Sequence, residues 1–162
     1  MTISKGDRLP AAKLLRLGAN GPEAVDLGAR LKGRKVVIFG LPGAFTGPCT
    51  TSHLPSFIRT RAAFGAKGVD EVICIAVNDP FTLNAWGEVT GAAKAGITLL
   101  GDAEGTFTQA LGMRFSAPDL GLINRATRYA MLVEDGVVSV LNLEKQAGAC
   151  ELTKGEELLA MI

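Results

Sequence analysis

Short runs of hydrophobic, mostly β-branched residues recur along this chain of 162 residues, and charged residues or glycines bound them. A nearly continuous apolar run of this length is typical of a strand that is buried on both faces of a sheet. The runs predict strands over 35–40, 71–77 and 97–100. Two more strands, over 128–134 and 137–143, flank Asp135-Gly136, a pair that strongly favours a two-residue hairpin.

Apolar residues recur at helical spacing in segments between these strands. The longest segment, 47–66, contains Pro55, which lacks a backbone N–H and is therefore expected to bend or break the helix. Asp102 is placed to cap a shorter helix. Besides the first, helices are expected over about 78–86, 105–111 and 153–161. Glycine and proline in the first thirty residues indicate a hairpin or an irregular entry.

Strands and helices alternate over most of the chain, and a hairpin and a final helix close it. This order predicts an α/β fold with a central mixed sheet flanked by helices on both sides. It resembles the order of a thioredoxin-like fold with extra elements. Because no repeat, low-complexity tract or linker interrupts the sequence, residues 1–162 are expected to form a single domain.

Composition and charge exclude several classes of function. There are 17 basic and 16 acidic residues, a balance that gives no electrostatic footprint for nucleic acid or for an anionic membrane surface. No segment approaches the ~18–20 apolar residues of a membrane-spanning helix. Because the first residues do not resemble a presequence, a cytoplasmic location is expected. Three cysteines are too few for a disulfide scaffold, so an important cysteine is expected to be catalytic or metal-bound.

Cys49 is the strongest candidate for such chemistry. It follows a loop between the strand 35–40 and the helix 47–66, at the carboxyl edge of the sheet where ligands bind in open α/β folds. Unpaired amides in the first turn of a helix favour a thiolate over a thiol. Thr46 could place its hydroxyl beside the sulfur. On position alone, a buried structural cysteine is an equally good interpretation.

The residues around Cys49 resemble those of the peroxiredoxin family. Pro42, Thr46 and Cys49 match its Pro-x-x-x-Thr-x-x-Cys motif. The resemblance runs from about residue 6 to the end of the chain. It is greatest to the atypical two-cysteine branch, the mammalian type V and plant type II enzymes, within the redoxin superfamily. The stretches that carry it are 42–46, 53–55, 68–71, 77–81, 85–86, 128–133 and 135–136.

This resemblance implies a role for each matching residue. Cys49 is the peroxidatic nucleophile that becomes a sulfenic acid. Arg128 stabilises the thiolate and the leaving oxygen. Thr46 orients the peroxide, and Pro42 shields the sulfur from water. The resemblance also implies a homodimer, and a reaction that uses neither a cofactor nor a metal.

Three residues close in sequence to Cys49 or Arg128 are interpreted separately. Pro48 occupies the position before the cysteine, where family members usually have a small residue whose amide is thought to donate to the peroxide; proline has no such donor. Either another donor substitutes for it or turnover is slower. Arg125 competes with Arg128 but has the wrong spacing, so we interpret it as a solvated loop residue. His53 lies on the helical face of Cys49 and is expected to support the helix or a subunit contact.

The other two cysteines decide how the sulfenic acid is resolved. Cys74 matches the second cysteine of plant type II enzymes, but its place within a strand favours a buried structural residue. Cys150 lies in a glycine-containing stretch, the region where type V enzymes carry their resolving cysteine. Cys150 is therefore slightly favoured as the resolving thiol. Resolution by an external thiol, from glutathione or glutaredoxin, is a nearly equal alternative. Thioredoxin is the other possible reductant.

The sequence thus predicts a thiol-dependent peroxidase that reduces hydrogen peroxide and organic hydroperoxides and serves antioxidant defence. The alternative is a redox-sensing or holdase-like binding protein that uses the oxidation of Cys49 as a switch. A thiol–disulfide reductase is a weaker interpretation, because the chain has no Cys-x-x-Cys motif. Arg128 favours the peroxidase, since a binding module needs no group to stabilise a leaving oxygen.

Overall fold

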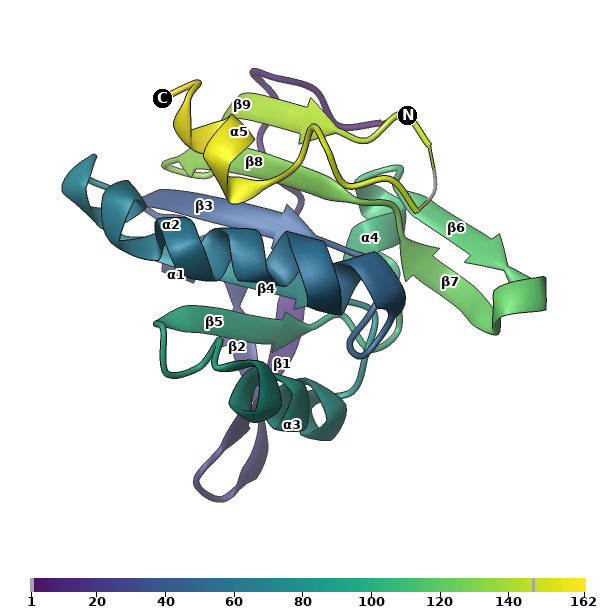
Figure 1. Cartoon of the computed structure of the whole chain (residues 1–162). Coiled ribbons are helices and arrows are strands. Elements are labelled where there is room, and N and C mark those ends of the chain that lie inside the picture. The colour runs from purple at the N-terminus through teal and green to yellow at the C-terminus, as the bar shows by residue number, and fades with distance from the viewer. Residues whose placement is uncertain (1, 147) are drawn as a thin grey trace.

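A seven-stranded mixed sheet forms the centre of the molecule, as the sequence predicts (Figure 1). The computed structural model describes residues 2–146 and 148–162; positions 1 and 147 of the expected domain lie outside the described residues. The three middle strands are parallel and the others antiparallel to their neighbours. In spatial order the strands are β2 (Gly21–Asp26), β1 (Lys13–Gly18), β5 (Ile97–Gly101), β4 (Glu71–Ala76), β3 (Lys35–Gly40), β8 (Tyr129–Glu134) and β9 (Val137–Leu143).

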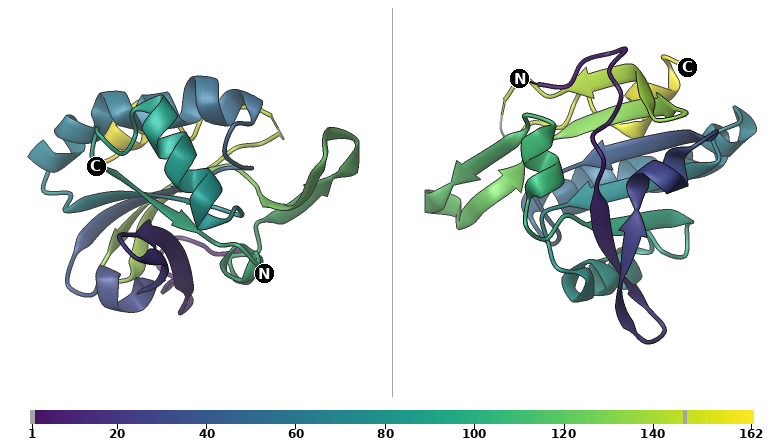
Figure 2. Two further views of the ribbon diagram at one scale, coloured as in Figure 1. Left: turned by 90° about the horizontal axis from the view of Figure 1, so that it is seen from below. Right: turned by 180° about the vertical axis from the view of Figure 1, so that it is seen from behind.

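Helices cover both faces of this sheet (Figure 2). One face packs against α2 (Leu54–Ala66), α3 (Pro80–Thr90) and α5 (Gly155–Leu159), and the other against α1 (Leu27–Leu31) and α4 (Thr106–Ala110). Residues of β3 alternate between the two hydrophobic clusters that result. This explains why the central strands are apolar at nearly every position.

The predicted helix 47–66 is present over its full length, but it contains a π-helical turn just before Pro55. A π-helical turn, η1 (Cys49–His53), comes first, and the amide of Leu54 donates to the carbonyl of Cys49. Pro55 then occupies the first turn of α2, where a missing N–H costs little. The helix therefore does not break at the proline; it widens into a π-helical turn just before it, a feature often found at functional sites.

Two parts of the fold are missing from the sequence-based prediction. One is α1, a five-residue helix capped by the Asp26 side chain. The other is a two-stranded arm, β6 (Arg114–Ala117) and β7 (Leu122–Ala126), which projects from the sheet (Figure 1). The arm is largely exposed and its strands have only four and five residues, too few for an alternating pattern to identify a strand. None of the helices in the described ranges has the length and apolar character needed to cross a membrane.

Candidate active site

The loop after β3 is shaped by its own hydrogen bonds and by β4. The amide of Ala44 donates to the Oδ1 of Asn78, just beyond the end of β4, at 2.9 Å. The hydroxyl of Thr46 donates to the carbonyl of Gly43 at 2.7 Å. Phe45 between them has a left-handed backbone with φ of 63°, unusual for a residue with a side chain. This tight turn leads the chain into η1 and buries Cys49.

Cys49 lies against a buried arginine. Strands β3 and β8 are antiparallel, and Gly40 pairs with Tyr129, so Arg128 lies beside the loop that follows β3. Its Nη2 donates to the Sγ of Cys49 at 3.3 Å, and its side chain is only 5% exposed. The guanidinium thus places a fixed positive charge and a hydrogen-bond donor beside the sulfur, in a buried site.

His53 is the second partner of this arginine. Its Nδ1 is 3.1 Å from the Nη1 of Arg128, and its Nε2 is 3.0 Å from the carbonyl oxygen of Thr153. A guanidinium can only donate and a carbonyl can only accept, so the ring is neutral and carries its proton on Nε2. Burial, with the positive charge of Arg128, lowers the pKa of His53 to about 3.

This low pKa makes stability depend on pH. The histidine is neutral when folded but takes up a proton near pH 6.5 when unfolded, so its contribution is complete above pH 6.5 and is lost as the pH falls toward 3. Between pH 7 and pH 5 the free energy of unfolding is expected to fall by about 2 kcal/mol. His53 is the only histidine, and most of the carboxylate contribution is lost below about pH 4.5.

Urea unfolding at both pH values measures this loss. The control is His53→Asn, whose side chain does not titrate, and its free energy of unfolding should change much less between pH 7 and pH 5. An equal change in the wild type and in the variant would contradict the assignment of a neutral buried histidine.

The other predicted residues lie near Cys49 but differ in what they contact. Pro42 is buried and Thr46 is half-buried. Among the described residues, Thr46 makes no hydrogen bond to the Cys49 sulfur, because its hydroxyl donates to Gly43. The interpretation of Arg125 as a solvated loop residue is wrong. It lies in β7, is half-buried, and its Nη1 donates to the carbonyl of Pro42 at 2.9 Å.

The two other thiols have different surroundings. Cys74 is fully buried within β4, and burial raises its pKa well above the usual value. Cys150 is half-buried in the segment between β9 and α5. Burial also raises the pKa of Cys150, although the nearby charge of Arg128 and the Ser52 hydroxyl act in the opposite direction. Both thiols are thus protonated at neutral pH, and only Cys150 lies outside regular secondary structure.

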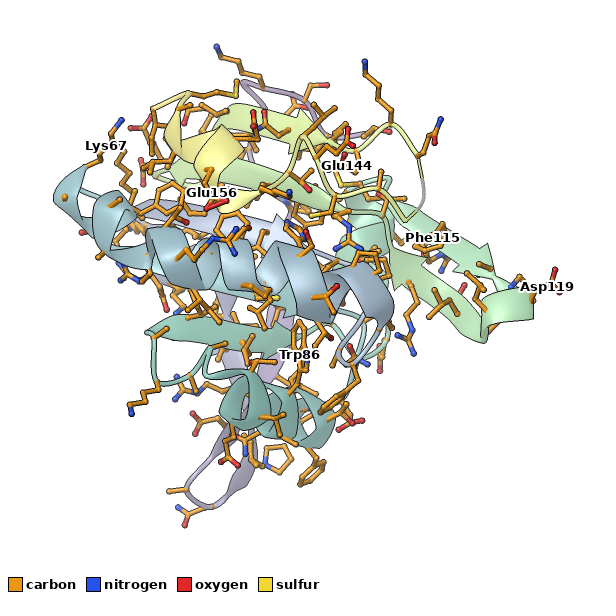
Figure 3. The ribbon with its side chains drawn as sticks, viewed as in Figure 1. Lys67, Trp86, Phe115, Asp119, Glu144 and Glu156 are labelled. Atoms are coloured by element: carbon orange, nitrogen blue, oxygen red, sulfur yellow. The ribbon has the colours of Figure 1, made fainter. Side chains whose placement is uncertain are left out.

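The Cys150 segment is held by one carboxylate, that of Glu144 (Figure 3). Its oxygens accept from the amides of Glu151, Leu152 and Thr153 at 3.0–3.1 Å, and from the Thr153 hydroxyl at 2.7 Å. Burial works to raise the pKa of Glu144, but these hydrogen bonds hold it below its usual value. Sequence reasoning missed this residue, since nothing near it indicates that three amides converge on it.

A small cavity adjoins the site. It has a volume of about 190 Å³, and Pro42, Phe115, Thr127, Arg128 and Glu144 are among its lining residues. Trp86, by contrast, is part of the core: it belongs to α3, is fully buried, and its Nε1 donates to the hydroxyl of Thr50 in η1 (Figure 3). Within the parts of the chain that the structure describes, no group of three or more histidine, cysteine and carboxylate side chains is arranged to hold a metal ion.

Known proteins resemble this chain in fold and in sequence. The profile of the Redoxin family matches residues 4–159, and the chain belongs to that family. The chain is 44% identical to "Peroxiredoxin-2E-2, chloroplastic" of Oryza sativa, covering 98% of this chain and 72% of that protein. It is 44% identical to "Peroxiredoxin-2F, mitochondrial" of Arabidopsis thaliana, covering 81% and 65%. Reduced Prx3 from Vibrio vulnificus, solved in complex with H2O2, matches with 38% identity and a TM-score of 0.92, covering 99% of both chains.

Within the Redoxin family, these relatives place the chain among the peroxiredoxins of plant type II. The chain is therefore a thiol-dependent peroxidase. They do not favour a redox-sensing or holdase-like binding protein. They also contradict the prediction of a cytoplasmic location, because the relatives from rice and Arabidopsis are chloroplastic and mitochondrial proteins. That prediction relied on the character of the chain's first residues, which does not determine the location.

Proposed function

We propose that Cys49 is the peroxidatic residue of this enzyme and that hydrogen peroxide and organic hydroperoxides are its substrates. The thiolate attacks one peroxide oxygen, so that an S–O bond forms as the O–O bond breaks. Cys49 becomes a sulfenic acid, and the other oxygen takes up a proton and leaves as water or an alcohol. The observation that carries this assignment is the 3.3 Å contact between the Cys49 sulfur and the buried Arg128 guanidinium.

Arg128 has a further donor for the substrate. Its Nη1 and Nη2 are paired with His53 and Cys49, whereas its buried Nε has no acceptor among the described residues. We assign this Nε–H to the peroxide oxygen, where it replaces the amide that Pro48 cannot supply. Pro42 keeps water from the sulfur, and Thr46 orients the peroxide through the lone pairs that its bond to Gly43 leaves free.

Cys150 is the proposed resolving thiol. It attacks the Cys49 sulfenic acid, a disulfide forms, and the hydroxyl leaves as water. The irregular segment of Cys150 supports this choice over Cys74, since Cys74 could reach Cys49 only if a central strand opened. Glutaredoxin with glutathione, or thioredoxin, then supplies two electrons to regenerate both thiols. The whole chain acts as one redoxin domain in this cycle.

Mass spectrometry under non-reducing conditions tests both cysteine assignments. After one equivalent of hydrogen peroxide and blocking of free thiols, we expect peptides that contain Cys49 and Cys150 to be joined by a disulfide. The matched variant Cys150→Ser should instead keep a Cys49 sulfenic acid that added glutathione captures. A Cys49–Cys74 link, or a sulfenic acid that persists in the wild type, would contradict the role of Cys150. Oxidation that starts at another cysteine would contradict that of Cys49.

A homodimer packed around the active-site loops is also proposed. Exposed hydrophobic side chains support it: Phe45 in the loop after β3, Phe81 at the start of α3, and Leu120 and Ile123 in the arm are 54–75% exposed. Such residues gain from burial against a second copy.

A further inference from the structure

His53 is linked to both the active-site arginine and the C-terminal segment. Arg128 donates to its Nδ1, and its Nε2 donates to the carbonyl of Thr153. Thr153 is itself held by Glu144, whose own amide donates to the carbonyl of Arg128 at 3.3 Å. His53, Arg128 and Thr153 are each at most 5% exposed, so water does not compete for these hydrogen bonds.

A guanidinium beside a sulfur atom can rotate so that different N–H groups point at the sulfur. The contact with Cys49 fixes only one of its nitrogens, and the guanidinium needs a second fixed acceptor to define its plane. Among the described residues, the Nδ1 of His53 is the one side-chain acceptor other than sulfur that Arg128 contacts. The His53 ring in turn packs at a tilt against the stacked rings of Phe39 and Phe57, with centroid distances of 5.1 and 5.6 Å.

We propose that His53 is a positioning residue, which holds the Arg128 guanidinium in the plane that serves Cys49 and takes its own orientation from the carbonyl of Thr153. Its neutral state suits this task, because a protonated ring could not accept from Arg128 and would place a second cation beside it. The inference depends on the proposed role of Arg128. By this route Glu144 and the residues 150–153, which include Cys150, also support the peroxide-reducing step.

Three replacements of His53 separate the acceptor for Arg128 from the donor to Thr153. In Asn the amide oxygen is bonded to Cγ, as Nδ1 is in histidine, so His53→Asn keeps an acceptor for Arg128. His53→Gln keeps a donor near the position of Nε2 but offers nothing at the position of Nδ1. His53→Leu removes both. The control is Ser56→Ala, which loses the buried hydrogen bonds from the Ser56 hydroxyl to the His53 carbonyl and from the Gly155 amide, but leaves the His53 ring.

Rapid-mixing kinetics with hydrogen peroxide give the readout. His53→Leu and His53→Gln are expected to slow sulfenic acid formation roughly ten- to a hundredfold, less than the ~10²–10³-fold loss of a donor itself. His53→Asn and Ser56→Ala should stay within about fivefold of the wild type, since each loses only neutral hydrogen bonds. If His53→Asn is as slow as His53→Leu, or if His53→Leu stays within fivefold, the proposal is wrong.

A double-mutant cycle with Arg128→Met shows whether His53 acts through Arg128. In the Arg128→Met background, His53→Leu should cause little further loss, because the group that it positions is absent. The same fold-loss in both backgrounds would overturn the proposal and leave His53 a purely structural residue. If Arg128→Met alone reacts as fast as the wild type, then the proposed role of Arg128 fails. If Arg128→Met is slow but the His53 variants react as fast as the wild type, only the positioning role of His53 fails and the proposed role of Arg128 stands.

Discussion

Cys49→Ser is expected to consume hydrogen peroxide no faster than ordinary free thiols do, since Cys74 and Cys150 remain. A serine hydroxyl stays protonated at neutral pH and its oxygen is not oxidised by peroxide, so the variant loses the attacking atom itself. Peroxide consumption after rapid mixing measures the effect. Cys74→Ala and Cys150→Ser are the matched controls, and both should keep the fast first step, because neither thiol is the proposed attacking group.

Loss of the first step in Cys74→Ala with retention in Cys49→Ser would reverse the assignment of the two buried thiols. A wild-type rate no greater than that of free cysteine would contradict efficient peroxidase activity at this site.

Arg128→Met is expected to slow peroxide attack about 10²–10³-fold. Converting an ordinary thiol completely to thiolate at neutral pH raises its reactive fraction only about thirtyfold, so the remaining acceleration must come from donors aimed at the peroxide oxygens. The free energy of unfolding should change by no more than about 1–3 kcal/mol, the cost of leaving the acceptor nitrogen of His53 unpaired. Stopped-flow kinetics and urea unfolding measure the two effects separately.

Arg125→Met is the matched control for this experiment. It removes the same charge, but its guanidinium contacts the carbonyl of Pro42 and not the sulfur. The loss in rate should stay within about tenfold, which corresponds to one hydrogen bond to a neutral group. If the two variants are slowed equally, the stabilisation of the leaving oxygen does not belong to Arg128 alone.

Most of the sheet could be predicted because its strands are buried on both faces. The predicted strands 35–40 and 137–143 coincide with β3 and β9, and the Asp135-Gly136 hairpin joins β8 to β9. The Asp102 carboxylate accepts from two amides at the start of α4, as a cap should. The arm could not be found in this way, because the alternation in β6 lasts only four residues and β7 does not alternate.

The site was predictable as a set of residues but not as a set of contacts. Cys49 and Arg128 are 79 positions apart in the sequence, and only the antiparallel pairing of β3 with β8 brings them together. The expectation that His53 supports the helix was too general. Its actual partners, Arg128 and Thr153, come from two other segments, and no local pattern identifies either contact.

The π-helical turn sets the rotational phase between Cys49 and the helix that follows it. The turn closes on an amide five positions along, where an α-helix would use the fourth, so it holds one residue more than regular winding requires. Each residue of an α-helix turns the chain by about 100°. An evolutionary deletion of a single residue here would therefore leave α2 packed on the sheet while it swung the thiol far from the guanidinium. The length of this turn is therefore as strictly required as the identity of Cys49 and His53 at its two ends.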